Sequence, residues 1–190
     1  MRQFLKFLKR LAYSRLISLF LQLFLSLFYD KKYLSGKFFD HFRIGYWWAI
    51  KGIPKRILLS RQNVKWPVGN QTQILCAKNI HFDNSSLNIF QQIGCYFQGF
   101  ATITIGKDVW IAPNVGIITA NHDLKDPEKH SEGKPVNIGD KCWIGMNSVI
   151  LPGVALGVNT VVGAGSVVTK SFPEGHCVIV GNPARKIRDI

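Results

Sequence analysis

The 190-residue sequence has little cysteine, and its four cysteines follow no spacing known from metal or dithiol sites. Cys76, Cys95, Cys142 and Cys177 form no C-x-x-C pair, which excludes the common zinc and redox motifs. Four cysteines in a chain of this length also fall short of a disulfide framework. We therefore expect buried free thiols in a reducing compartment.

Charged residues are also few, at 18%, while apolar residues reach 47%, so the composition excludes disorder for most of the chain. The formal net charge of +13 is spread unevenly. Residues 1–66 hold 14 Lys/Arg against two acids, whereas residues 67–190 hold 10 against 9. A basic, aromatic-rich segment thus precedes a near-neutral domain, and this localised charge argues against a nucleic-acid partner for the whole chain.

A long uncharged stretch is missing from residues 1–29, which are otherwise predicted to form an amphipathic helix because they lack Pro and Gly and are rich in Leu and Phe. The longest charge-free run, Leu16–Tyr29, has 14 residues, whereas a bilayer span needs about 20. No small-residue cleavage site follows it, so a cleaved signal peptide fits poorly. A thin polar stripe steps along the helix, and its members are Arg10, Ser14, Ser18, Gln22 and Ser26.

Basic and aromatic residues alternate through the rest of this leading segment, up to Trp66. Lys and Arg beside Trp and Tyr suit the headgroup zone of a bilayer. We therefore expect residues 1–50 to lie on a membrane surface, with their cations near anionic headgroups. Two alternatives stay open: a helix packed on the protein's own core or on a neighbouring subunit, and a true membrane span.

From residue 87 an aliphatic residue recurs at every sixth position, in eleven of twelve cases. The series is Leu87, Ile93, Gly99, Ile105, Ile111 and Ile117, then Ile138, Ile144, Ile150, Leu156, Val162 and Val168. Four residues later comes a second set of inward candidates: Val109, Val115, Cys142, Ser148, Val154, Thr160 and Ser166. This period predicts a parallel β-helix, in which each hexad is a short strand plus a turn and three hexads make one coil.

One aliphatic residue per hexad specifically predicts the left-handed form, an all-β fold that departs from the usual right-handed crossover. The β-branched residues and recurrent glycines disfavour an α-helix here. Turn conformations are expected from glycine and from Asn114, Asp140, Asn147 and Asn159. The expected architecture is therefore a left-handed parallel β-helix domain over residues 67–190, preceded by a helical membrane-surface segment over residues 1–66.

The repeat is interrupted once, between Ile117 and Ile138, where the spacing of 21 residues exceeds three hexads by three. The excess falls in residues 121–135, which are polar and charged and contain two prolines. We expect a loop extruded from the coil, and a polar loop on a rigid scaffold is a common place for function.

From about residue 68 to the end, two thirds of the chain, the sequence resembles the hexapeptide-repeat acyltransferases, and more narrowly their galactoside, maltose and polysaccharide O-acetyltransferase branch. The loop histidine together with the terminal GNPAR makes this an enzyme resemblance, because the hexads alone would indicate only a fold. The segments that carry the resemblance are IAPNV at 111–115, ITANHD at 118–123, IGDKCWIG at 138–145, ILPG at 150–153, VGAGSVVTK at 162–170 and VGNPAR at 180–185.

The resemblance implies acyl transfer from acetyl-CoA to a hydroxyl, by a homotrimer with active sites between its subunits. The family's catalytic histidine corresponds to His122, which would be the general base on the acceptor hydroxyl. Asn114 corresponds to a substrate-contacting asparagine, with a turn role as the alternative. Asp123 would orient the His122 ring or contact substrate, or else merely cap the turn. No covalent nucleophile is needed, so Cys142 is not expected to react.

The resemblance also places acetyl-CoA in the groove between the coils of adjacent subunits, with no metal. The turn that includes Trp143 and Met146 is expected to supply a backbone N–H for the oxyanion. Lys170 and Arg185 would meet the phosphates, because cations suit them. The full set of implied cofactor-binding residues is Trp143, Met146, Ala164, Lys170, Pro183 and Arg185.

Two other functions stay open. Left-handed β-helix carbonic anhydrases bind a metal with three histidines from two subunits, and the available set here is His81, His122 and His130. A non-catalytic scaffold that tethers a complex to a membrane is the second alternative. The position of His122 within its motif favours the acyltransferase over both.

The acceptor is not selected by any residue of the loop. Acetyl-CoA is cytosolic, so we expect an enzyme on the cytoplasmic face of a bacterial cell membrane that O-acetylates a sugar hydroxyl of a lipid-linked polysaccharide or glycolipid precursor. A soluble sugar, an amino sugar or a xenobiotic is the alternative acceptor. Residues 1–66 do not resemble the short, mostly polar N-terminal unit of the galactoside and maltose enzymes, so no acceptor-binding residue is carried over from that unit.

Overall fold

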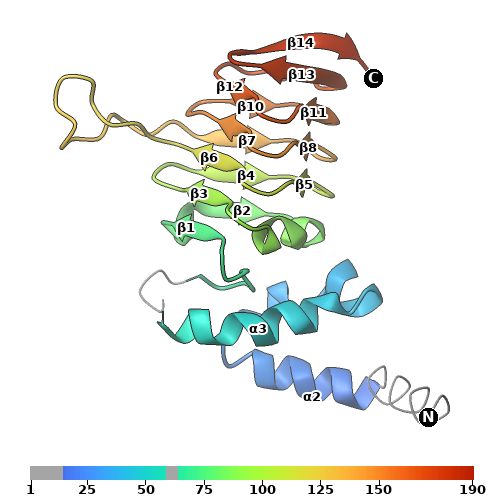
Figure 1. Cartoon of the computed structure of the whole chain (residues 1–190). Helices are drawn as coiled ribbons and strands as arrows, with labels where there is room; N and C mark the ends of the chain where they lie inside the picture. The colour runs from blue at the N-terminus through green and yellow to red at the C-terminus, as the bar shows by residue number, and fades with distance from the viewer. Residues whose placement is uncertain (1–14, 59–63) are drawn as a thin grey trace.

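The computed structural model describes residues 15–58 and 64–190. Short strands are stacked in a column, and the column stands on a small group of helices (Figure 1). The part of the predicted amphipathic helix in residues 1–14 lies outside the described residues. The division of the chain between residues 66 and 67 stays a prediction.

The helical base has two α-helices joined by two short turns: α2 (Arg15–Leu25), η1 (Lys31–Tyr33), η2 (Lys37–His41) and α3 (Ile44–Leu58). α2 is shorter than predicted, because the chain leaves the helix after Leu25 and buries Tyr29, whose hydroxyl donates to Ala49 O at 2.9 Å. Neither α2 nor α3, nor any other helix in the described part of the chain, has the length and hydropathy of a bilayer-spanning segment.

Three parallel sheets form the sides of the column, and the chain visits them in rotation. The first sheet has the order β1-β3-β6-β9-β12, the second β2-β4-β7-β10 and the third β5-β8-β11-β13-β14. All pairs are parallel except β13–β14. The strands are β1 (Gln73–Leu75), β2 (Ile80–Phe82), β3 (Tyr96–Gln98), β4 (Ile103–Ile105), β5 (Trp110–Ile111), β6 (Gly116–Ile118), β7 (Val136–Ile138), β8 (Trp143–Ile144), β9 (Val149–Ile150), β10 (Ala155–Leu156), β11 (Thr160–Val162), β12 (Val167–Val168), β13 (Cys177–Gly181) and β14 (Ala184–Asp189).

The hexad residues from Ile105 onward line the inside of the column, as predicted. In the first sheet Ile117 pairs with Ile150, and Ile150 pairs with Val168, so equivalent side chains lie directly above one another. Each of these three side chains is 0% exposed. The second set of inward candidates, from Val109 to Ser166, is buried too. Stacked apolar side chains therefore form one continuous core.

The predicted register is wrong for the first coil. Ile93 is 60% exposed, and Phe97 takes the inward place beside Ile117 that the count of six assigned to Gly99. The third side of this coil is the 3-10 helix η5 (Asn84–Gln91) in place of a strand. Its residues Ile89 and Phe90 are both 0% exposed. Aromatic side chains thus replace the aliphatic repeat at the lower end of the column, where the ring centroids of Phe90 and Phe97 lie 4.9 Å apart.

The asparagines at the turns behave as predicted, whereas Asp140 does not. Asn114, Asn147 and Asn159 have φ of 59°, 59° and 58°, in the left-handed region. At the fourth turn Lys141 holds that conformation, with φ of 57°. Asp140 instead accepts a hydrogen bond from Lys107 N at 2.8 Å and so links neighbouring coils.

The glycine that follows each inward residue is needed for a close approach between coils. A Cβ at Gly145 would lie 2.6 Å from Ala164 N, and one at Gly157 would lie 2.2 Å from Pro173 O. Neither glycine has a positive φ. Sequence reasoning had assigned these glycines to turn conformations, and the structure corrects that assignment to backbone packing.

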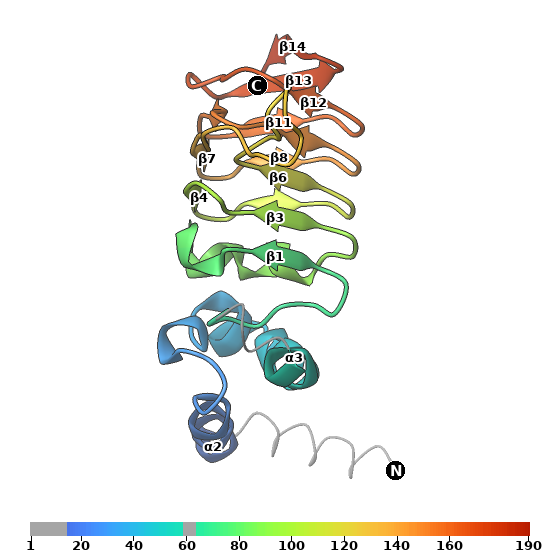
Figure 2. The same cartoon turned by 90° about the vertical axis from the view of Figure 1, so that its left-hand side faces the viewer.

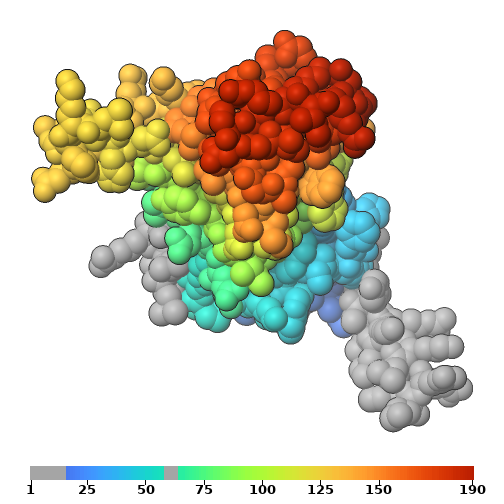
Figure 3. Space-filling model, turned by 45° about the horizontal axis from the view of Figure 1, so that its top comes forward, coloured from blue at the N-terminus to red at the C-terminus, as the bar shows by residue number. Residues whose placement is uncertain are grey.

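Residues 121–135, predicted to be extruded from the coil, lie between β6 and β7. This loop leaves the column and stands out from its side as an arm (Figure 3). At the root, Gln98 Oε1 accepts hydrogen bonds from Thr119 N at 3.2 Å and Ala120 N at 3.0 Å. At the tip, Leu124 is 99% exposed. The rigid coil therefore fixes the loop at its base and leaves its end in solvent.

Candidate active site

His122 lies on the extruded loop, and one hydrogen bond defines its tautomer. Its Nδ1 lies 2.6 Å from Pro127 O. A carbonyl oxygen only accepts, so Nδ1 carries the proton and Nε2 is left with a free lone pair. The loop backbone supports this geometry, because Asp123 N donates to Lys129 O and Ser131 N donates to Asn121 O, both at 2.8 Å. The Pro127 contact thus selects the tautomer in which Nε2 is the nitrogen that can accept a proton.

His130 packs against His122, which the sequence did not reveal. An isolated antiparallel bridge joins the two residues, and their ring centroids lie 4.4 Å apart with the planes at 34°. Phe100, from the coil below, meets the other side of His130 edge-on at 5.1 Å. The His122 ring is therefore held by a hydrogen bond at one edge and an aromatic stack on one face. The sequence offered His130 only as a metal-ligand candidate and did not predict its contact with His122, which arises when the loop folds back on itself.

Asp123 does not orient the His122 ring, and the prediction of that role is wrong. Its Oδ1 accepts from Lys125 N at 2.8 Å and from Asp126 N at 3.1 Å. This arrangement is a side-chain-capped turn. The orienting partner of His122 is the Pro127 carbonyl instead. Asp123 lines the same open hollow as His122 and Lys125. A contact between Asp123 and the substrate stays a prediction.

Asn114 lies at the corner between the third and first sheets, which we name the cofactor corner for the residues predicted along it. Its Nδ2 donates to Asn147 Oδ1 at 3.1 Å, so the two asparagines form a ladder between coils. Its exposed side chain also closes against Gly94, where a Cβ would lie 2.0 Å from Asn114 Oδ1. The turn role is thus built into the coil, and the exposed amide leaves a substrate role as a prediction.

Three predicted cofactor residues follow Asn114 up the same corner. Met146 lies one coil above it, and Gly165 N beside Ala164 donates to Met146 O at 2.8 Å. Pro183 lies in the next turn, anchored by the Gly181 N bond to Ser166 Oγ at 3.1 Å. Trp143, on β8, precedes Met146 and is 55% exposed, in register with the equally exposed Trp110. The structure therefore brings these predicted residues into one exposed column.

The predicted phosphate-binding cations are not together. Arg185 lies on β14, opposite Val180, near the top of the cofactor corner. Lys170 follows β12 at the corner between the first and second sheets, which is also the corner that emits the loop. There its Nζ lies 5.6 Å from the centre of the Phe172 ring. Within one chain, Lys170 groups with the loop corner of His122 and not with Met146 and Ala164.

The predicted oxyanion turn has one donor in use and one available. Gly145 N donates to Val162 O at 2.8 Å. Met146 N, by contrast, makes no hydrogen bond within the part of the chain that the structure describes. An unpaired N–H on an exposed corner suits an anionic oxygen. The residues present thus fit the acyl thioester that the resemblance implies.

The buried thiols are not placed to react. Cys142 is 0% exposed, its Sγ donates to Gly157 O at 3.2 Å, and burial raises its pKa. Burial also raises the pKa of Cys95. Cys76 departs from the prediction of buried thiols, because it is exposed. As to a metal, residues 15–58 and 64–190 hold no cluster of three or more His, Cys, Asp or Glu side chains.

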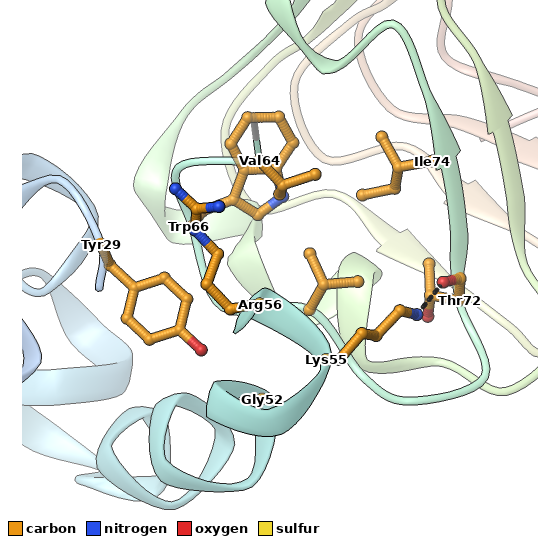
Figure 4. A pocket seen from close by; sticks show the side chains of 9 residues that line it. Tyr29, Gly52, Lys55, Arg56, Val64, Trp66, Thr72 and Ile74 are labelled. Carbon is orange, nitrogen blue, oxygen red and sulfur yellow. Dashed lines mark hydrogen bonds between the residues drawn. The ribbon is translucent and has the colours of Figure 1, made fainter. Parts of the chain in front are cut away.

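A small cavity lies where the helical base meets the coils (Figure 4). Tyr29, Lys55 and Trp66 line it, and Lys55 Nζ donates to Gly69 O at 2.9 Å while burial lowers its pKa. The cavity volume is about 30 Å³, which is about one water molecule's share of the liquid. It is too small for an acyl donor or a sugar, so the exposed corners are the candidate site.

Known proteins agree with this geometry. Residues 135–170 match the family described as "Hexapeptide repeat of succinyl-transferase". The galactoside O-acetyltransferase of Escherichia coli is 46% identical over 94 residues, which cover 47% of this chain and 45% of that protein. The chain spans about half the length of the curated relatives it matches.

Two solved structures extend the likeness. A maltose O-acetyltransferase from Clostridium difficile is 31% identical, covers 94% of this chain and 90% of its own, and has a TM-score of 0.52. A galactoside acetyltransferase in complex with coenzyme A is 32% identical, covers 72% and 70%, and has a TM-score of 0.55. The first coverage is wide enough to include most of the helical base. The chain belongs to the hexapeptide-repeat acyltransferase family, in the branch of the galactoside and maltose O-acetyltransferases.

Proposed function

We propose that this protein transfers an acetyl group from acetyl-CoA to a sugar hydroxyl, with His122 as the general base. The observation that carries the proposal is the 2.6 Å contact between His122 Nδ1 and Pro127 O, which leaves Nε2 as the nitrogen available to an acceptor on an exposed loop. The family membership supports the reaction class, and the left-handed sense of the coil, which the hexad period predicts, is part of the same proposal.

The proton path follows from the tautomer. Acetyl-CoA supplies an acetyl thioester, so the products are an ester and a free thiol. His122 Nε2 takes the proton of the acceptor hydroxyl as its oxygen bonds to the acetyl carbon, and His122 returns that proton to sulfur as the carbon–sulfur bond breaks. The Met146 N–H is available to the oxygen that gains negative charge. Base assistance of this kind is worth about 10²–10⁴-fold.

His130 is a positioning residue in this proposal. It touches His122 and no reacting atom, and its ring at 4.4 Å restricts the rotation of the His122 imidazole. The Pro127 carbonyl sets which nitrogen faces outward, and the stack sets the plane in which that nitrogen lies. A base held in one orientation avoids much of the entropic cost of positioning at each turnover.

A homotrimer completes the site in this proposal. His122 and Lys170 belong to the corner between the first and second sheets, whereas Asn114, Met146 and Ala164 belong to the cofactor corner on the other edge of the first sheet. The chain cannot close these two edges on one another, since the first sheet separates them. A neighbouring subunit that sets its cofactor corner against the loop would bring the acyl donor and the base together.

A hydroxyl acceptor is proposed because the chain resembles galactoside and maltose O-acetyltransferases. An imidazole base can also take a proton from an ammonium, so the base alone does not distinguish O-transfer from N-transfer. The sugar class rests on the likeness to galactoside and maltose O-acetyltransferases. A soluble sugar, an amino sugar and a lipid-linked glycan are distinguished by the test below.

The test follows free thiol release from acetyl-CoA with purified wild type and His122→Ala, each given a soluble sugar, an amino sugar and a membrane-extracted glycolipid fraction. We expect acceptor-dependent release that falls 10²–10⁴-fold in the variant. Cys76→Ala, which removes the exposed thiol, is the matched control and should match wild type. Equal release by wild type and His122→Ala would remove His122 from the mechanism, and transfer only to amines would replace the O-acetyl assignment.

A further inference from the structure

The helix α2 has the opposite orientation to an ordinary surface helix, because its polar face contacts the protein and its apolar face is exposed. Its polar side chains face the protein: Gln22 Nε2 donates to Leu34 O at 3.2 Å, and Arg43 donates to Ser18 Oγ. Both Ser18 and Gln22 also hydrogen-bond Tyr46 on α3. The sequence predicts this polar stripe without assigning the side it faces, and the structure places Ser18 and Gln22 against the protein's own base.

The opposite face of α2 is apolar and uncovered. It carries a run of large side chains at helical spacing, with exposed fractions from 41% to 80%. They are Leu16 at 80%, Leu19 at 55%, Phe20 at 68%, Leu23 at 67%, Phe24 at 41% and, one turn beyond the helix, Leu27 at 77%. A contiguous exposed apolar face of this kind marks an interaction surface. We name these six residues the α2 outer face.

A cation borders the α2 outer face, and the neighbouring helix α3 carries an exposed aromatic–cation pair. Lys31 lines the same hollow as Leu19 and Leu23. On α3, Trp47 is 54% exposed and Lys51 Nζ lies 4.7 Å from the centre of a Trp47 ring. Residues 1–66 carry 14 basic residues against two acids. This combination matches an anionic lipid surface, which offers hydrocarbon to the apolar face and phosphate to the cations.

We propose that the α2 outer face inserts into the headgroup–acyl boundary of an anionic bilayer and stands the column end-on upon it. α2 lies at the end of the molecule opposite β13 and β14 (Figure 1 and Figure 2). The proposal does not depend on catalysis, because it concerns a surface remote from the loop of His122. It places the protein at a membrane as a peripheral component, and the cytosolic source of acetyl-CoA assigns the cytoplasmic face of the cell membrane.

The end-on arrangement limits the acceptor, and this step, like the choice of the cytoplasmic face, rests on the proposed function. In the first sheet β6 is two strands above β1, which is a rise of about 10 Å at about 4.8 Å per strand. The helical layer adds about 10 Å or more. The loop of His122 therefore lies on the order of 20 Å above the lipid. An acceptor carried by a lipid needs an extended glycan headgroup to reach it.

Flotation with vesicles tests the docking. Full-length protein is mixed with vesicles of phosphatidylcholine and phosphatidylglycerol at about 3:1, or of phosphatidylcholine alone. We expect wild type to float with the anionic vesicles and the bound fraction to fall at least tenfold in the double variant Leu19→Glu/Leu23→Glu. Lys31→Gln should weaken binding to anionic vesicles about fivefold, which corresponds to about 1 kcal/mol per cation near the surface.

The matched control is Ile187→Glu/Ile190→Glu, two side chains on the opposite end of the molecule that are 59% and 50% exposed. It adds the same charge and should float like wild type. Far-ultraviolet circular dichroism checks that both double variants are folded. Flotation of Leu19→Glu/Leu23→Glu at the wild-type level overturns the proposal. A second outcome also overturns the proposal. If wild type does not bind vesicles and its mass in solution halves on Leu19→Glu/Leu23→Glu substitution, the α2 outer face binds a second copy of the protein.

Discussion

The coils and the helical base are built on opposite principles. From Ile105 upward the coils turn aliphatic side chains inward and carry nearly balanced charge, with 10 basic and 9 acidic residues over 67–190. The base turns Ser18 and Gln22 inward, exposes Leu and Phe, and carries 14 basic residues against two acids. The coils bury their apolar surface within the column, so in the proposed trimer they contact a neighbouring subunit only at their corners. The α2 outer face exposes apolar side chains, which an apolar medium would cover. In the two proposals made above, the coils carry the chemistry and the helical base sets the location.

The largest change in the free energy of unfolding should come from truncating a side chain inside the coils. Ile144→Ala removes a side chain that is 0% exposed and is stacked between Ile111 and Val162. We expect a loss of about 2–5 kcal/mol in the free energy of unfolding, from lost burial plus a cavity. Leu23→Ser in the base should change it little, because Leu23 is 67% exposed. Urea unfolding of both variants compares the regions directly, and equal losses would break the contrast.

The next largest loss of stability should come from a substitution that forces neighbouring coils apart. Gly157→Ala puts a Cβ 2.2 Å from Pro173 O and 2.5 Å from Gly175 N, where backbone must move. We expect a cost of about 2–3 kcal/mol from overpacking. Gly116→Ala is the control, because its Cβ would lie 3.7 Å from the nearest atom, on Val149. Thermal unfolding of the pair measures the difference, and a Gly157→Ala as stable as the control would contradict the packing account.

A smaller effect is expected at the loop. His130→Ala removes the ring stacked on His122 and should lower kcat on the order of tenfold while KM stays unchanged, since the base loses orientation and not its proton. His130→Phe keeps an aromatic ring at this place and should restore most of kcat. Steady-state thiol release gives both constants. Equal losses in the two variants would show that the imidazole, not the stack, matters.

The smallest effect concerns an inward phenol of the base. Burial raises the pKa of Tyr29 from 10.0 to about 12, although Arg56 lowers it in part. The neutral phenol is therefore favoured by folding, and its contribution is present below pH 10 and lost as pH rises from 10 to 12. We expect Tyr29→Phe to be less stable at neutral pH, by about 1 kcal/mol for the lost hydrogen bond, but to lose less stability between pH 10 and 12. Parallel urea titrations at several pH values measure this.

The sequence predicts which side chains of the coils are buried, because a regular repeat places equivalent residues at equivalent positions. From Ile105 every sixth side chain meets an equivalent one, so burial follows from counting. The count failed at Ile93 because the first coil ends on helices and an aromatic cluster, where Phe82 and Phe90 centroids lie 4.7 Å apart and no equivalent coil lies below. In that coil the inward position is set by the pairing of Phe97 with Ile117 and not by the six-residue spacing.

The rest of the site depended on contacts between distant residues. The motif located His122, but the Pro127 hydrogen bond and the His130 stack exist only in the folded loop. An amphipathic pattern likewise shows that α2 has two faces without showing which one faces the protein. That choice is made by Leu34 and Tyr46, 12 and 24 residues after Gln22 in the sequence.

The central claim is an acyl-transfer site shared by two subunits, with the base from one chain and the cofactor corner from the next. Its most direct test is co-expression of His122→Ala with Ala164→Trp, each with its own affinity tag, followed by purification through both tags. Each variant alone should be inactive in thiol release, the first without a base and the second with a blocked corner. Doubly tagged assemblies should regain activity, because some interfaces pair an intact His122 with an intact Ala164. Doubly tagged assemblies as inactive as their parents would contradict the shared site.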